Sequence, residues 1–160
     1  MRDLGSPVHS KKWFEAILRY YGENARIGLV YYNKQLIGAC IILSINNNVS
    51  IPWASTIQEY NRFSPNMLLY WGVIKYAADN GFVRFDFGRS TPDEGTYKFK
   101  EQWGAQPVPL YWNYINLCHN DIKINTPNMA GRNTVARLWQ KLPLGVANFI
   151  GPPIRKHISL

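Results

Sequence analysis

Apolar residues near the start of the chain recur at helical spacing. Within residues 11–21 they form a single stripe, at Trp13, Phe14, Ile17, Leu18 and Tyr21. This spacing is typical of residues that share one face of an α-helix. Ser10 stands where an N-cap is needed and Gly22 follows the last apolar position, so we expect a helix bounded by these two residues.

Three strand-like stretches come next. Residues 25–32 and 35–45 are separated only by Asn33-Lys34, which predicts a tight hairpin turn. Three asparagines at 46–48 then turn the chain into a third strand, 49–54. Pro52 lies inside that strand, and because proline cannot donate to a sheet it indicates an edge position or an irregularity.

Ser64-Pro65 marks the start of a central helix, since serine suits the N-cap and proline the first helical position. Helical spacing predicts an apolar face on this helix and Asn80-Gly81 its end; the face comprises Met67, Leu68, Trp71, Ile74 and Ala78. The remaining expected elements are a strand at 82–87, a turn at 91–95, a short helix at 96–103, a strand at 108–117 and a helix at 134–142.

The predicted strand at 82–87 and the residues directly after it contain several charged and polar side chains that could bind a ligand. Its alternation places Phe82, Arg84 and Asp86 on one face, opposite three apolar residues. Gly88 ends it, so Arg89 and Ser90 emerge at its carboxyl end. In α/β sheets the carboxyl ends of the strands are where ligands usually bind, and we therefore expect the binding site there.

Length, composition and charge narrow the class of protein. The chain has 160 residues and 46% hydrophobic content, which predicts a single domain with a hydrophobic core. A net charge of +8 predicts attraction to polyanions such as nucleic acid, anionic membrane surfaces or phosphorylated substrates. Cys40 and Cys118 lie in apolar runs, which favours reduced core residues, and the three histidines form no metal motif, so no metal site is expected.

Several spaced motifs carry a family resemblance: Asp86-Phe87-Gly88-Arg89-Ser90, then Gly95-Thr96-Tyr97-Lys98-Phe99-Lys100, then Trp103-Gly104-Ala105. Together they resemble the FemAB-like branch of the GNAT superfamily of N-acyltransferases, in particular the FemAB-related proteins of exosortase and exopolysaccharide systems. The order of expected elements matches the same fold. The resemblance implies an α/β fold with a mixed, mostly antiparallel sheet that is flanked by helices and splays open between the strands at 49–54 and 82–87.

The resemblance also implies a domain organisation. The whole chain, 1–160, would be one GNAT-like domain, with a core at about 9–117, a loop at 118–133 and a C-terminal helix and tail at 134–160. Such proteins usually carry two GNAT-like domains, so this chain resembles the C-terminal half, with an N-terminal GNAT-like half as a partner.

Members of the Fem type transfer an aminoacyl group from charged tRNA to an amine of a peptidoglycan precursor, and other relatives are N-acyltransferases. The resemblance therefore implies an acyl-CoA (acetyl-CoA included) or an aminoacyl-tRNA as donor and co-substrate, and an amine of a cell-envelope, peptidoglycan-type or exopolysaccharide precursor as acceptor. The glycine-rich phosphate loop of acetyl-CoA-dependent members is not recognisable here, because the segment 56–65 contains no glycine.

The candidate catalytic residues are Lys100, Tyr97 and Glu59. The resemblance assigns Lys100 to substrate phosphate and the reacting acyl group, and a lysine beside a strand end can stabilise an oxyanion. Tyr97 is a candidate donor to the acyl carbonyl, with core packing as the alternative. Glu59 is a candidate acceptor of the amine proton, with an ordinary exposed glutamate as the alternative.

The candidate substrate-binding residues are Arg89, Ser90, Lys98, Tyr60, Asn66 and Asp86. Arg89 suits a phosphate or carboxylate, and its alternative is an ion pair with Asp86 or Asp93. Asp86 is either a general base or the structural partner of Arg89 or of a backbone turn. Tyr60 and Asn66 flank the helix start that would face the donor.

Two other functions stay open at this point. The first is a non-catalytic GNAT-like module that binds a phosphorylated sugar or nucleic acid; the second is a basic nucleic-acid-binding domain, although no DNA partner is expected. The lack of a signal peptide or long apolar run predicts a cytoplasmic protein. The apolar tail with its basic end, 142–157, either contacts the inner membrane face or packs on the sheet or a missing domain, and its prolines argue against one continuous helix.

Overall fold

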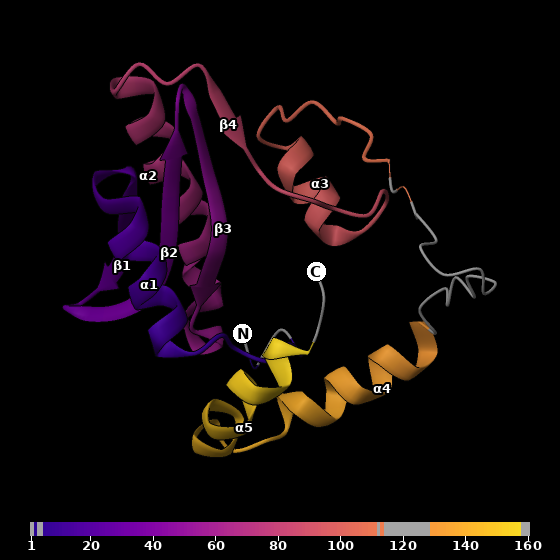
Figure 1. Cartoon of the computed structure of the whole chain (residues 1–160). Coiled ribbons are helices and arrows are strands. Elements are labelled where there is room, and N and C mark those ends of the chain that lie inside the picture. Colours follow the sequence, from indigo (N-terminus) through magenta and orange to yellow (C-terminus); the bar gives the residue numbers. More distant parts are fainter. Residues whose placement is uncertain (1, 3–4, 112, 114–128, 158–160) are drawn as a thin grey trace.

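The computed structural model describes residues 2, 5–111, 113 and 129–157, and Figure 1 shows their arrangement. The elements in chain order are α1 (Lys11–Tyr21), η2 (Gly22–Asn24), β1 (Ala25–Tyr32), β2 (Gln35–Ile45), β3 (Asn48–Thr56), η3 (Gln58–Phe63), α2 (Pro65–Asp79), β4 (Arg84–Asp86), α3 (Gly95–Glu101), α4 (Met129–Gln140) and α5 (Leu144–Lys156). The expected α/β class with a mixed, mostly antiparallel sheet and flanking helices is confirmed.

Residues close together in the sequence determine where the first helix begins and ends and where the first hairpin turns. The Ser10 hydroxyl accepts from the Trp13 amide at 3.1 Å, and Gly22 ends α1 at a positive φ of 53°. Asn33 and Lys34, with φ of 47° and 66°, form the turn between β1 and β2. Residues that tolerate positive φ close such two-residue hairpins, which is why the turn could be predicted from sequence.

The sheet has the order β1-β2-β3-β4, with β1, β2 and β3 antiparallel and β4 parallel to β3. Ile41 pairs with Trp53 and Leu43 with Ser50, so β3 carries one extra residue in this interval. Pro52 lies within it, and the expected irregularity is confirmed. The missing proline N–H is tolerated there because a bulge interrupts the ladder.

The main core lies between the sheet and α2. Leu69, Val73 and Ala77 of α2 pack among buried strand residues that include Val49 and Ile51. The face predicted for this helix was wrong, because Met67, Leu68, Trp71 and Ala78 are exposed. The helix carries apolar side chains on nearly every side, so periodicity could not single out the face that the sheet covers.

The opposite face of the sheet meets α1, α5 and the N-terminal segment. Phe14 of α1 contacts Trp53 of β3 edge to face, with ring centroids 5.7 Å apart. A Cβ on Gly5 would come within 2.7 Å of the Ala136 Cβ, and one on Gly151 within 3.2 Å of the Val8 amide nitrogen. These glycines let the N-terminal segment pass closely against α4 and α5.

Several predictions for the second half of the chain need correction. Residues 108–111 and 113 are not in a strand, since Pro107 and Pro109 remove two ladder donors, and Val108 and Tyr111 are 79% and 85% exposed. The rest of that predicted strand, Cys118 and the loop at 118–128 lie outside the described residues. The last predicted helix begins earlier, at Met129, so 129–133 is not loop. β4 is also shorter than predicted, and Val83 before it is exposed.

The tail was expected to be interrupted by its prolines, yet α5 contains Pro152 and Pro153. Proline has a helix-compatible φ, and its cost inside a helix is the lost hydrogen bond to the residue four earlier. Those earlier residues, Asn148 and Phe149, are exposed, so water can satisfy their carbonyls. Within the described residues, no helix is long and apolar enough to cross a membrane.

Candidate functional site

The central feature of the site is the divergence of β3 and β4, which we call the opening. The two parallel strands pair only from Asn48↔Arg84 to Ser50↔Asp86. β3 then runs on to Thr56, while the chain leaves β4 after Asp86 and heads to α3 (Figure 1). The expected divergence of these two strands is confirmed, and the backbone of β3 beyond Ser50 has no strand partner on this side within the described residues.

A tight turn follows β4 at this opening. The Asp86 carboxylate accepts from the Gly88 amide at 2.7 Å, and Gly88 has a φ of 69°. A short acidic side chain that bonds an amide two residues on is a standard turn-former, and glycine adopts positive φ without steric cost. Of the roles considered for Asp86, the observed contact is the one with a backbone turn.

Lys100, on α3, reaches back to the same turn. Its Nζ donates to the carbonyl oxygens of Gly88 and Arg89 at 2.8 and 2.7 Å. Partial burial lowers the pKa of Lys100, and the nearby Asp86 carboxylate partly offsets this. An ammonium has three N–H donors, so these two bonds leave one donor for a ligand.

Aromatic contacts fix α3 beside α2. The Phe99 ring meets Tyr70 of α2 edge to face at 5.0 Å, and Tyr70 stacks on Phe87 at 5.9 Å. Trp103 meets Phe99 at 6.3 Å, and its Nε1, like Ser90 Oγ, is buried without a hydrogen-bond partner in the described part of the chain. Because such groups are costly when unpaired, they are candidates for ligand contacts.

The structure brings only some of the predicted residues together. Asp86, Arg89 and Lys100 meet at the turn, with Ser90 next to it. Tyr97 and Lys98 belong to the same short helix, the first half-buried and the second exposed. These six residues form one group.

The other three candidates lie on different elements. Asn66 stands one turn before Tyr70 on α2, and residues four apart share a helix face, so Asn66 lies on the side that faces α3. Tyr60 of η3 donates to Gln35 of β2 at 2.7 Å, so its hydroxyl is engaged at the β1–β2 hairpin. Glu59 is exposed in the same 3-10 helix.

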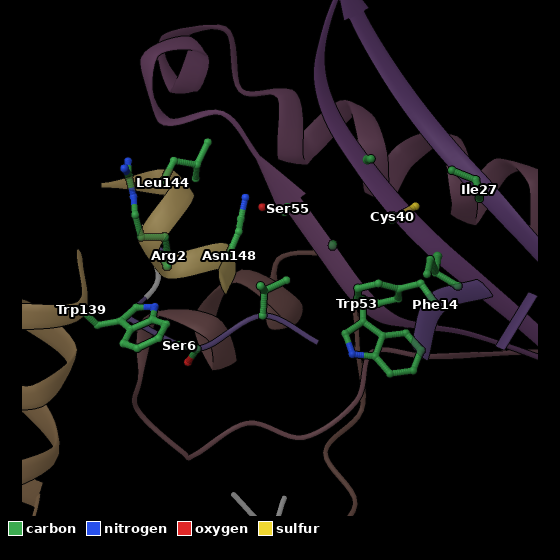
Figure 2. Close-up of a pocket in the computed structure, with 15 residues that line it drawn as sticks. Arg2, Ser6, Phe14, Ile27, Cys40, Trp53, Ser55, Trp139, Leu144 and Asn148 are labelled. Carbon is green, nitrogen blue, oxygen red and sulfur yellow. The ribbon is translucent and has the colours of Figure 1, made fainter. Parts of the chain in front are cut away.

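The sequence did not predict a cavity that lies on the sheet face opposite to α2. It has a volume of about 320 Å³ and lies beside β3, between the sheet, the N-terminal segment, α4 and α5 (Figure 2). Trp53 lines it together with Ser55, Trp139 and Asn148. Alternation along β3 places Trp53 and Ser55 on one face, but only the tertiary structure brings α4 and α5 to them. No cluster of metal-ligating side chains occurs among the described residues.

Comparisons with known proteins agree with this architecture. Residues 1–101 match the model of a family described as an acetyltransferase (GNAT) domain. An aminoglycoside acetyltransferase from an uncultured soil metagenomic sample, crystallised with trehalose, is similar in structure with a TM-score of 0.52, 11% identity and coverage of 68% of this chain and 76% of that one. A Pyrococcus furiosus protein assigned as an acetyl transferase is also similar in structure. Its TM-score is 0.51 and its identity is 14%, and the match covers 66% of this chain and 74% of that one.

Proposed function

This chain belongs to the family of acetyltransferase (GNAT) domains, an acyltransferase family, and we propose that it transfers an acyl or aminoacyl group to an amine of a cell-envelope or exopolysaccharide precursor. The observation that carries the proposal is the divergence of β3 and β4 after Ser50 and Asp86, together with the turn after β4 that Lys100 holds. Donor and acceptor aligned in such an opening can react directly, without a covalent enzyme intermediate.

The proposed reaction is a single displacement at the acyl carbon. The amine lone pair attacks the carbonyl carbon, an N–C bond forms, and the donor's thiol or ribose hydroxyl leaves. The amine gives up one proton, for which Glu59 is the proposed acceptor, and the leaving sulfur or oxygen takes up one proton, so that the charges balance. Most of the rate gain then comes from positioning and from stabilising the carbonyl oxygen as it becomes negative.

Lys100 is the proposed donor to that oxygen. Two of its N–H groups are fixed by Gly88 and Arg89, which orients the third, and its positive charge suits a developing oxyanion. Tyr97, one turn away on α3, is the proposed second donor. Both side chains come from one helix, which holds them in a fixed relation.

The donor's phosphates need a separate set of contacts. A helix N-terminus usually offers free amides to phosphate, but at α2 Pro65 has no N–H, the Ser64 amide donates to Asn61 and the Met67 amide donates to Ser64. Side chains must therefore supply most of the phosphate contacts, and we propose Arg89, Ser90 and Lys98 for this role, with Asn66 and Tyr60 closer to the start of α2. This applies to an acyl-CoA and to an aminoacyl-tRNA alike.

The test compares Lys100→Met with Lys98→Met in a transfer assay. Amine-bearing nucleotide-sugar precursors are incubated with acetyl-CoA, longer acyl-CoAs or charged tRNA, and products are measured by mass spectrometry. We expect Lys100→Met to reduce transfer by about 100-fold, the typical loss for one oxyanion donor, with a smaller loss of donor affinity because the turn that carries Arg89 and Ser90 loosens. Lys98→Met alters an exposed lysine of the same helix and should change donor affinity more than the chemical step.

Transfer that survives Lys100→Met at the full rate contradicts the role of this lysine. If the unaltered chain binds phosphorylated sugars but transfers no acyl group from any of these donors, the proposed activity is wrong. The alternative of a non-catalytic binding module would then be supported. The engagement of Lys100 by two carbonyls is the observation that favours this alternative, because it gives the lysine a structural task.

A further inference from the structure

The cavity beside β3 is the strongest feature that the proposed reaction does not use. Its lining residues come from the sheet, from α1, α4 and α5, and from the N-terminal segment, and most of them are apolar. Trp53, Ala54 and Ser55 belong to the part of β3 beyond Ser50, where β4 has diverged. A molecule in the cavity would therefore lie against the same stretch of strand that borders the opening.

The cavity has an apolar end and a polar end. In Figure 2, Ile27, Cys40, Phe14 and Trp53 lie on one side, where the sheet meets α1. The labelled polar residues lie on the other side, near α4 and α5: Arg2, Ser6, Ser55 and Asn148. A ligand that is polar all round, such as a sugar, would leave hydroxyl groups unpaired at the apolar end, which is costly.

The polar end also holds an unpaired donor. Trp139 is 8% exposed, and its Nε1 is buried without a hydrogen-bond partner in the described part of the chain. Figure 2 shows the indole nitrogen turned toward Arg2 and Asn148. A buried N–H normally has a partner, so this group indicates an oxygen acceptor that arrives with a ligand. Arg2 lies at the same end of the cavity, where its Nη1 donates to the Leu142 carbonyl oxygen at 3.3 Å, and its positive charge favours a carboxylate or a polarised carbonyl there.

We propose that this cavity binds a medium-length aliphatic chain, with the carbonyl or carboxylate oxygen at its end bonded to the Trp139 indole N–H. A volume of about 320 Å³ holds roughly ten non-hydrogen atoms at the ~30 Å³ of a water molecule in the liquid, which corresponds to a chain of about eight carbons. The inference deepens the proposed function and rests on it in one respect, since such a chain would be part of a substrate of the acyl transfer.

Binding alone tests the inference, so its failure is distinguishable from a failure of acyl transfer. The dissociation constants of butyrate, hexanoate, octanoate and dodecanoate are measured on the full chain by calorimetry. We expect affinity to rise about fourfold for each added CH₂ up to roughly eight carbons and then to stop rising, because each buried CH₂ contributes ~0.8 kcal/mol. The absence of binding, or an affinity that is independent of chain length, overturns the proposal.

Three variants locate the site. Ala147→Leu adds bulk to a cavity residue of α5 that is 2% exposed, and it should weaken octanoate binding at least tenfold. Val146→Leu changes an exposed neighbour on the same helix that does not line the cavity, and it should leave binding unchanged. Trp139→Phe removes only the N–H and should weaken binding several-fold while the chain-length dependence persists. Equal effects of Ala147→Leu and Val146→Leu contradict the proposed location.

A comparison of octanoyl-CoA with octanoate shows whether the aliphatic chain comes from the acyl donor or from another ligand. If it binds more tightly than octanoate, the chain belongs to the acyl donor; if octanoate binds as well or better, the chain belongs to the acceptor or to a free acid. Either result supports the aliphatic site. Failure of both ligands to bind overturns it, whatever the transfer assay shows.

Discussion

The Arg155 guanidinium donates from Nε to Nε2 of His9 at 3.1 Å and joins α5 to the N-terminal segment across 146 positions of sequence. The acceptor nitrogen must be unprotonated, so His9 is neutral here, with its proton on Nδ1. His9 also stacks on Trp13 at 5.2 Å and meets Trp53 edge to face at 5.9 Å. The imidazole therefore links three parts of the fold at the sheet face that carries the cavity.

This contact predicts that acid weakens the fold. Partial burial, and secondarily the Arg155 charge, lower the pKa of His9 below 6.5. The unfolded chain therefore binds the proton more readily, and stability that is present above pH 6.5 is lost as pH falls through the lower folded-state pKa. Because solvent screens a half-buried group, we expect a loss of less than about 1 kcal/mol between pH 7 and pH 5.

Urea denaturation at several pH values checks this prediction. His9→Gln keeps a hydrogen-bond acceptor but cannot titrate, so it should show a smaller pH dependence than the unaltered chain. Lys11→Gln, an exposed change two positions away, serves as the control and should keep the full dependence. Equal slopes for His9→Gln and the unaltered chain would show that His9 is not the group responsible.

Loss of the Lys100 ammonium should loosen the turn after β4. Lys100→Met removes two charge-assisted hydrogen bonds to Gly88 and Arg89, and we expect unfolding free energy to fall by about 1–2 kcal/mol at this half-exposed site. Chemical denaturation measures the change. Lys98→Met, on the same helix but exposed, should alter stability by less than about 0.5 kcal/mol. Similar effects of both changes would contradict a specific role for Lys100 in the turn.

Gly88→Ala tests the backbone of the same turn. A Cβ at Gly88 would meet no atom within 4 Å, so the cost arises from its φ of 69° alone and should be about 1–2 kcal/mol. Gly95→Ala adds a Cβ in equally open space at the start of α3, without a positive φ, and should be neutral or slightly stabilising. Thermal unfolding separates the two; a neutral Gly88→Ala would mean that the turn can relax.

Gly28→Ala tests the packing of the core. A Cβ at Gly28 would lie 2.7 Å from the Cys40 sulfur, which is buried, so the sulfur or the strand has to shift at a cost of about 1–3 kcal/mol. Gly72→Ala places a Cβ in open space on α2 and should stabilise the helix by up to about 1 kcal/mol. Opposite signs in denaturation midpoints are the expected result, and a stabilised Gly28→Ala would show that the core accommodates the added carbon.

The first half of the fold could be predicted closely from the sequence because its signals are local. The helix at 11–21 and the strands at 25–32 and 35–45 have the predicted bounds. Side-chain periodicity, a capping serine and a two-residue turn depend only on residues a few positions apart, so the elements that they predict do not change when the rest of the chain folds. The family resemblance supplied the splayed sheet, which periodicity alone does not specify.

The sequence also predicted a group of candidate site residues, since a strand end, a glycine turn and a lysine-rich helix lie close together in the chain. It did not indicate what they contact. The bonds from Lys100 to Gly88 and Arg89, and the hydrogen bond from Tyr60 to Gln35, depend on where separate elements lie after folding. The buried face of α2 was likewise unpredictable, because an apolar helix shows which face is buried only when the sheet covers it.

By itself, then, the sequence determined the order of the first elements, the motifs at the end of β4 and the membership of the GNAT superfamily. Only the tertiary structure decided the cavity, because its walls come from Arg2, Ser6 and Val8, from the sheet and from α4 and α5, which are far apart in the chain. It also decided that α5 continues through two prolines. The physical reason is the range of the interactions: backbone propensity acts over neighbouring residues, whereas burial depends on all the segments that meet in space.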